Sequence, residues 1–139
     1  MRKYIRHPSN IPIEFQVAQG KNNHTENLHD ISVGGLSFQT QGCIKKNSII
    51  KIHIPIMKPA FYANGVVVWC HKHDNAYDVG VKFVDNYTAF RVRMIEQICY
   101  IEGYRKQVFE VEGRKLSGEE AAEEWIDKFA KNFPDTVHH

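Results

Sequence analysis

The feature that most constrains the fold is a period-two alternation of apolar and polar residues over the first 85 residues. It is clearest in one segment, where Lys51, His53 and Pro55 separate four isoleucines at positions 50, 52, 54 and 56. Side chains two positions apart in an extended chain share one face of a sheet, so the pattern predicts a strand with one buried face. Pro55 indicates that this strand ends near a sheet edge.

The same alternation predicts further strands over residues 11–17, 24–31, 36–40, 61–70 and 79–83. Turn-forming residues separate them, with a loop at 42–48 and a polar turn at 71–76. Gly65 predicts a bulge or bend inside the long strand. Six or seven short strands at this spacing predict a small antiparallel β-barrel over residues 11–85, and a chain of 139 residues can bury its core without metal or disulfide help.

After Asp85 the apolar period changes to that of a helix, carried by Phe90, Met94, Ile98 and Ile101. Residues 108–113 are predicted to break this helix, with a short extended piece there. Ser117 and Glu120 then form the sequence pattern of a capping box, which predicts a second helix ending before Pro134. The fold class is therefore mainly β with C-terminal α, and the helical extension 86–139 is expected to pack on the barrel.

Charge, cysteine content and the distribution of apolar residues bear on the partners and the location of the protein. The net charge of +2 is too small to indicate a nucleic-acid partner, and no DNA or RNA binding is expected. Three widely spaced cysteines indicate free thiols in a reducing cytoplasm. No apolar run is long enough to cross a bilayer, and no secretory signal follows the first basic residues. We therefore expect a cytoplasmic protein without membrane insertion.

A polar group of residues lies where two predicted strands meet, at positions 30–35. Asp30 and Ser32 share one side of the strand, while His29 and Ile31 are expected to face the other side. Gly34 and Gly35 are expected to allow a turn with positive φ and a close approach to the main chain. These residues predict a polar recognition surface, although the same residue types also form ordinary turns.

The first ten residues carry two arginines, at positions 2 and 6, and no acid. The composition is that of a mobile tail. The R-x-x-x-R spacing, followed about two dozen residues later by D-x-S-x-x-G, resembles the two signatures of the PilZ domain, the bacterial receptor module for cyclic di-GMP. Residues 77–83 also resemble the closing strand of that family. The resemblance covers about residues 1–85 and implies a stand-alone PilZ barrel whose ligand contacts are Arg2, Arg6, Asp30, Ser32, Gly34 and Gly35.

The chemistry of these residues suits cyclic di-GMP. An arginine fork pairs with phosphate oxygens and with guanine O6 and N7, and a carboxylate at Asp30 complements the N1–H and N2–H₂ donors of guanine. Ser32 can donate to a phosphate or hold the loop. We expect residues 1–10 to be flexible, to clamp the dinucleotide when it binds, and to relay binding to an unidentified protein partner through the C-terminal helices.

Other functions are less consistent with the sequence. A PilZ-type adaptor acting without nucleotide, for example in pilus assembly or motility, would lack the arginine motif, and homodimerisation is left open. No cofactor is expected. Residues 70–74 include cysteine, histidine and aspartate, which can bind zinc, but the sequence has no second cluster of such residues to complete a zinc site. Enzyme activity is not expected, because His29 is predicted to face away from Asp30 and Ser32. Trp69 could stack on single-stranded nucleic acid, but it lacks interleaved basic residues.

Overall fold

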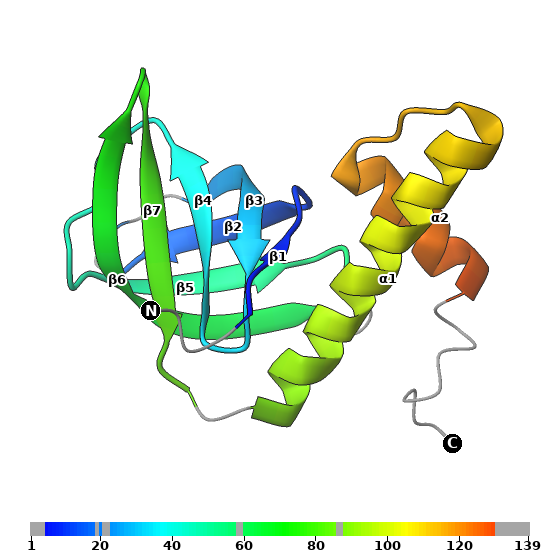
Figure 1. Ribbon diagram of the computed structural model, residues 1–139. Coiled ribbons are helices and arrows are strands. Elements are labelled where there is room, and N and C mark those ends of the chain that lie inside the picture. The colour runs from blue at the N-terminus through cyan, green and yellow to red at the C-terminus, as the bar shows by residue number, and fades with distance from the viewer. Residues whose placement is uncertain (1–4, 19, 21–22, 58–59, 86–87, 130–139) are drawn as a thin grey trace.

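The computed structural model describes all residues except 1–4, 19, 21–22, 58–59, 86–87 and 130–139. Two helices, α1 (Thr88–Glu112) and α2 (Gly118–Phe129), follow the strands in the chain and lie to one side of them (Figure 1). The strands are β1 (His7–Pro8), β2 (Pro12–Val17), β3 (His24–Ile31), β4 (Gly35–Thr40), β5 (Ile49–Ile54), β6 (Phe61–His73) and β7 (Ala76–Phe83).

The strands form an antiparallel barrel. Their order is β1-β3-β2-β5-β6-β7-β4, and an additional pairing of β3 with β4 closes six of them into a ring. The short strand β1 is the seventh and pairs with β3 outside this ring, with His7 opposite Ile31 and Pro8 opposite Asp30. The predicted fold class, a mainly β barrel followed by two helices, is confirmed.

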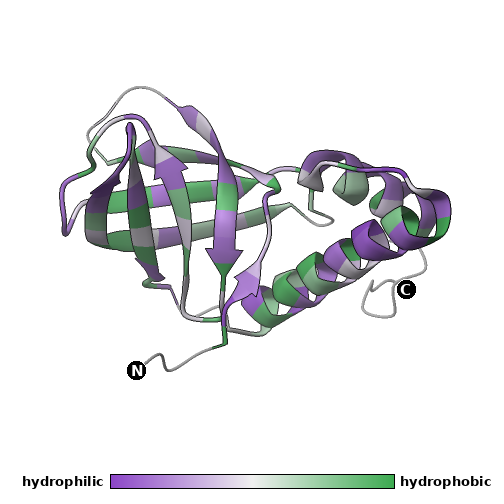
Figure 2. Cartoon of the chain, turned by 45° about the horizontal axis from the view of Figure 1, so that its top comes forward, coloured by the Kyte–Doolittle hydropathy of each residue, from purple (hydrophilic) through white to green (hydrophobic). Residues whose placement is uncertain are grey.

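The period-two pattern fills the barrel interior. Ile50, Ile52 and Ile54 of β5 are buried, whereas Lys51 between them is exposed. Bands of opposite hydropathy alternate along the strands in Figure 2. The strand ends at Ile54 and not at position 56, because Pro55 cannot donate to the ladder.

Two details of the β6–β7 hairpin differ from the prediction. The bulge lies between Val67 and Trp69 and not at Gly65. The strands also continue through most of the segment predicted as a turn, which is reduced to Asp74 and Asn75. Asp74 adopts a left-handed φ of 56°, a conformation that Asp tolerates in two-residue hairpins, so the tight connection needs no glycine.

The first helix is longer than predicted. The expected break at 108–113 was wrong, since α1 continues to Glu112 and Val108 is buried. The helix ends at Gly113, whose φ is 72° and whose N–H donates to the carbonyl of Phe109 at 2.9 Å. The capping box of α2 is confirmed: Glu120 N–H donates to Ser117 Oγ at 3.0 Å, and Ser117 N–H donates to Glu120 Oε1 at 2.9 Å.

The start of α1 packs against the barrel, and α2 packs against α1 (Figures 1 and 2). The ring of Phe90 stacks on that of Phe61 in β6, with centroids 5.2 Å apart. Further along the helices, the side chains that join the barrel core are Met94, Ile95, Ile98, Ile101, Ala121, Ala122 and Trp125. No helix in the described part of the chain is long and apolar enough to span a membrane.

Candidate functional site

Arg6 and Asp30, two of the predicted ligand residues, meet on the outside of the barrel. Pairing of β1 with β3 brings Arg6, which directly precedes β1, next to Asp30. Arg6 Nη1 donates to Asp30 Oδ1 at 2.7 Å, and Ser37 Oγ on β4 donates to the same oxygen at 2.8 Å. The Arg6 side chain is 24% exposed, so its remaining donors can still be reached from solvent. Arg2 lies outside the described residues.

Ser32 holds the loop between β3 and β4. Its hydroxyl oxygen accepts from the N–H groups of Gly34 and Gly35, both at 3.2 Å, and its own N–H donates to the Gly35 carbonyl at 2.7 Å. Ser32 is also buried. The sequence allowed Ser32 either to donate to a phosphate or to hold the loop. The structure shows Ser32 holding the loop backbone.

The two glycines of the loop do not adopt the positive φ that the sequence suggested. Among the described glycines, the left-handed conformation is found at Gly113. Gly35 is required for another reason: a Cβ at this position would overlap the carbonyl oxygen of Val81 on β7. The sequence predicted that a ligand would approach the main chain closely here. In the structure it is the neighbouring strand β7 that approaches Gly35 closely.

A small polar cavity of about 130 Å³ opens beside the Arg6–Asp30 pair. It is lined by Arg6, His29, Asp30, Ser37, Phe38, Trp69 and Asp78. The prediction that His29 faces away from Asp30 was wrong. A bulge between Leu28 and Asp30 places two residues of β3 opposite Ser37, which brings both side chains toward one side of the strand.

Trp69 contributes an aromatic surface to this polar cavity. Its ring lies against Gly80 of β7, where any Cβ would overlap the indole, and it stacks on His71 with centroids 5.1 Å apart. The bulge between Val67 and Trp69 interrupts the inward alternation of β6, so Trp69 leaves the barrel interior. Trp69, Ser37 and Asp78 were not predicted from the sequence to belong to the site.

The loop at 30–35 is tied directly to the first helix. Arg91 of α1 is buried, and its Nε donates to the carbonyl of Val33 at 2.9 Å. Its Nη1 donates to Asp85 Oδ1 at 2.7 Å and to the Asp85 carbonyl at 2.9 Å. The guanidinium also lies 5.3 Å from the centroid of the Phe83 ring. One side chain thus joins the loop at 30–35, the segment that follows β7, and α1.

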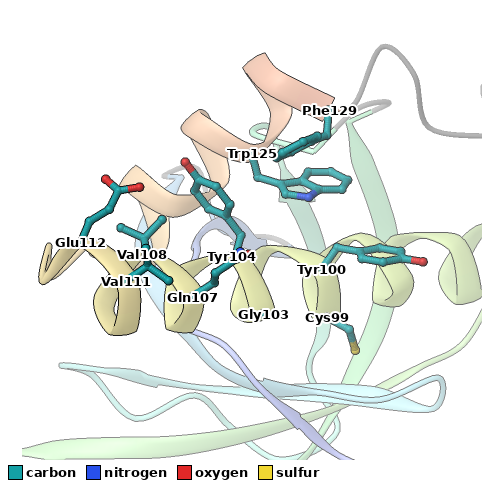
Figure 3. A pocket seen from close by; sticks show the side chains of 10 residues that line it. All are labelled: Cys99, Tyr100, Gly103, Tyr104, Gln107, Val108, Val111, Glu112, Trp125 and Phe129. Carbon is teal, nitrogen blue, oxygen red and sulfur yellow. The ribbon is translucent and has the colours of Figure 1, made fainter.

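A second and larger hollow lies between the helices (Figure 3). This α1–α2 groove has a volume of about 460 Å³ and is lined by Cys99, Tyr100, Gly103, Tyr104, Gln107, Val108, Val111, Glu112, Trp125 and Phe129. Tyr100 and Trp125 stack with centroids 5.9 Å apart. Few of the lining side chains can bind phosphate, so the groove does not have the chemistry of a nucleotide site.

Hydrogen bonds to Glu124 join α2 to α1 and to the turn between the two helices. Arg114 donates to both carboxylate oxygens of Glu124, at 3.0 and 3.1 Å, and Tyr104 donates to Glu124 at 2.7 Å. These hydrogen bonds lower the pKa of Glu124 to about 2, and the hydrogen bonds from Arg114 have the largest effect. In the part of the chain that the structure describes, no group of three or more His, Cys, Asp or Glu residues could hold a metal ion.

The sequence matches the PilZ domain over residues 1–100. The chain belongs to the PilZ domain family. No curated protein matches the sequence. Among solved structures, the PilZ domain of Escherichia coli YcgR with c-di-GMP aligns with a TM-score of 0.61 at 12% identity, covering 81% of this chain and 98% of that one.

Two longer proteins share the fold. Bacillus subtilis MotI, an inhibitor of motility, aligns with a TM-score of 0.58 at 12% identity over 68% of this chain and 47% of its own. The K. pneumoniae MrkH–c-di-GMP complex aligns with a TM-score of 0.57 at 15% identity over 76% of this chain and 54% of its own. This PilZ chain thus spans about half the length of these two relatives.

Proposed function

We propose that this PilZ chain is a receptor for cyclic di-GMP and that the ligand binds at the Arg6–Asp30 cavity. The observation that carries the proposal is the Arg6–Asp30 ion pair in a cavity that Trp69 also lines. A guanidinium, a carboxylate and an aromatic ring are the groups that recognise a guanine nucleotide by hydrogen bonding and stacking. The relatives solved with c-di-GMP, YcgR and MrkH, share the fold and support the assignment.

Each residue has a defined part in the proposed complex. Arg6 keeps donors free for guanine O6 and N7 or for a phosphate, and Asp30 accepts from the N1–H and N2–H₂ edge of guanine. Ser37 fixes the carboxylate of Asp30, and Ser32 fixes the loop. The cavity, at about 130 Å³, is smaller than a dinucleotide, so part of the ligand would lie outside it. Arg2 and the rest of the N-terminal segment are proposed to close over that part.

The same segment offers a route from the ligand to the helices. His7 of β1 pairs with β3, and its Nδ1 lies 3.5 Å from the Sγ of Cys99 on α1. Asn10 lies against Gly118 at the start of α2, where a Cβ would overlap its side chain. Closing of the N-terminal segment over a ligand would therefore act on both helices, and we propose that this changes the surface offered to a protein partner.

Isothermal titration calorimetry with cyclic di-GMP tests the receptor proposal. Wild type should bind, and Arg6→Ala should bind at least about tenfold more weakly, because a hydrogen bond to a charged group contributes roughly 1.5–3 kcal/mol. Arg114→Ala is the matched control, since it removes the same charge from the turn between the helices, on a residue that does not line the cavity. Equal affinity of Arg6→Ala and wild type would refute the assignment of the site.

A second function, that of an adaptor that binds a protein without nucleotide, is favoured by the α1–α2 groove. Tyr100, Val111 and Phe129 line the groove and are 56%, 75% and 47% exposed. Large apolar side chains gathered at a hollow are typical of protein contacts. If the folded wild type does not bind cyclic di-GMP, the receptor proposal fails and the adaptor function becomes the one to test.

A further inference from the structure

Two cysteines far apart in the sequence lie side by side on the barrel. Cys43 follows β4 and Cys70 belongs to β6, and their Sγ atoms are 3.6 Å apart. Neither is in a disulfide; Cys43 is exposed and Cys70 is partly buried. The third cysteine, Cys99, lies on α1, where its neighbour is His7. The protein thus carries one pair of adjacent thiols and one separate thiol.

The fold holds the pair together. The loop that carries Cys43 is anchored by the buried side chain of Ile44. Further along the loop, Asn47 N–H donates to the carbonyl of Val67 at 2.7 Å, and Val67 N–H donates to the carbonyl of Ser48 at 2.9 Å. These contacts fix the loop to β6 only three residues before Cys70. The proximity of the thiols therefore follows from the packing of the loop.

The geometry lies within reach of a disulfide bond. An S–S bond is about 2.05 Å long, so the sulfur atoms must approach by roughly 1.5 Å. Cys43 lies outside the strands and can supply this movement, since the space around neighbouring Gly42 is open. We propose that Cys43 and Cys70 are a thiol-modification site that forms a reversible intramolecular disulfide with a small-molecule disulfide of the glutathione class as oxidant.

The reaction proceeds by two exchange steps. The thiolate of the exposed Cys43 attacks one sulfur of oxidised glutathione, which forms a mixed disulfide and releases the first glutathione thiol. Cys70 then attacks Sγ of Cys43, forms the Cys43–Cys70 bond and releases the second glutathione thiol. Two electrons pass from the protein to the oxidant, and the two cysteine protons end on the two glutathione molecules.

Both steps need a thiolate, and the pKa of Cys43 is raised in the resting pair. The hydrogen bond with Cys70 is the main reason that the pKa of Cys43 is raised, with burial a smaller one. Burial, followed by the charges of Glu102 and Glu96, likewise raises the pKa of Cys99. Exchange should therefore be slow at neutral pH for both kinds of site, so the comparison must be made at equilibrium.

The disulfide would join the β4–β5 loop to the strand that carries Trp69. Cys70 directly follows Trp69, and the indole of Trp69 lines the Arg6–Asp30 cavity. Oxidation would therefore constrain β6 next to the proposed ligand site. The disulfide itself does not depend on the proposed function, so its test can succeed or fail whether or not the protein binds cyclic di-GMP.

The experiment equilibrates the wild-type protein at a fixed concentration of oxidised glutathione and increasing concentrations of the reduced form. Acid quenching, alkylation and peptide mass spectrometry then give the state of each cysteine, with Cys99 as the internal reference. The Cys43–Cys70 disulfide should persist at a reduced-glutathione concentration at least about tenfold above that which frees Cys99, because its second thiol is already in place.

Cys70→Ser is the matched control, since it leaves Cys43 exposed but without a partner. Its Cys43 should carry glutathione and be freed together with Cys99. The proposal is overturned if wild-type Cys43 and Cys70 each carry a separate glutathione, or if both are freed in step with Cys99.

Discussion

The molecule has two hollows of opposite character. The Arg6–Asp30 cavity measures about 130 Å³ and is lined largely by charged and polar groups, whereas the α1–α2 groove measures about 460 Å³ and is largely aromatic and aliphatic. Volume alone would select the groove as the ligand site. The groups that pair with phosphate and guanine edges are in the smaller cavity, so the chemistry of the lining residues is the better guide.

The cavity and the groove also differ in what their residues contribute to ligand binding and to stability. Apart from Phe38, which belongs to the barrel core, the residues that line the cavity lie outside that core, so substitutions of them should cost less stability than substitutions in the core. The groove residues include Trp125, which is buried and belongs to the same core as the barrel interior. We therefore expect substitutions in the cavity to act on ligand binding and substitutions in the groove to act on folding.

The largest effect is expected for Trp125→Ala. This change should lower the free energy of unfolding by about 3–5 kcal/mol, because it removes a buried aromatic side chain and leaves a void. Urea denaturation measures the loss, and Phe129→Ala, at a more exposed ring, should cost clearly less. Cyclic di-GMP affinity of the folded fraction should change far less than in Arg6→Ala, because Trp125 does not line the cavity. A loss as large as that of Arg6→Ala would contradict the placement of the ligand site.

Trp69→Ala should weaken cyclic di-GMP binding by roughly 1–3 kcal/mol, the range measured for a base stacked on an aromatic side chain. Calorimetry measures this loss. Trp69→Phe is the control that keeps a ring over Gly80 and should recover most of the affinity. If alanine and wild type bind equally, the ligand does not contact this ring.

Ser37→Ala should have a smaller effect, a loss of about 1 kcal/mol in cyclic di-GMP affinity. The hydroxyl is not expected to contact the ligand; it donates to Asp30 Oδ1 at 2.8 Å and orients that carboxylate. Asp30→Ala should lose more affinity than Ser37→Ala, and the double variant should be no weaker than Asp30→Ala alone. Additive losses would contradict a role through Asp30.

The smallest effect is expected at the exposed end of the helices. Glu124 has a pKa lowered from 4.5 to about 2 in the folded protein, chiefly by Arg114. A carboxyl with a lowered folded-state pKa contributes stability above its unfolded pKa and loses it as pH falls through the folded value. Wild type should therefore exceed Glu124→Gln slightly in stability above pH 4.5, and the difference should vanish as pH falls toward 2. A difference independent of pH would contradict the prediction.

Much of the fold could be predicted, because alternation and capping are local signals. The isoleucines of β5 and the Ser117–Glu120 box have the structure that their spacing predicts. The break predicted after Val108 was wrong, because tertiary packing buries Val108 and the helix continues through β-branched residues. The bulges were predicted at the wrong positions or not at all. A bulge depends on the register between two strands, and the sequence of one strand does not contain that register.

The candidate site could be predicted only in part. The motif spacing led to Arg6 and Asp30, which form an ion pair, and to Ser32, which fixes the loop. His29 was predicted to face the wrong side and Trp69 was not predicted to belong to the site, because each lies at a bulge that interrupts the alternation of its strand. For Trp69 a signal was present in Gly80, its cross-strand partner, since a glycine opposite a large ring leaves room for the ring to lie flat.

The hydrogen bond from Arg91 to the carbonyl of Val33 has a consequence for how the protein opens. Arg91 is buried, so the loop at 30–35 cannot separate from α1 without breaking a buried hydrogen bond from a charged group. Local unfolding of the loop and fraying of the first turns of α1 therefore become one cooperative event. Truncation of α1 should therefore loosen this loop of the barrel as well.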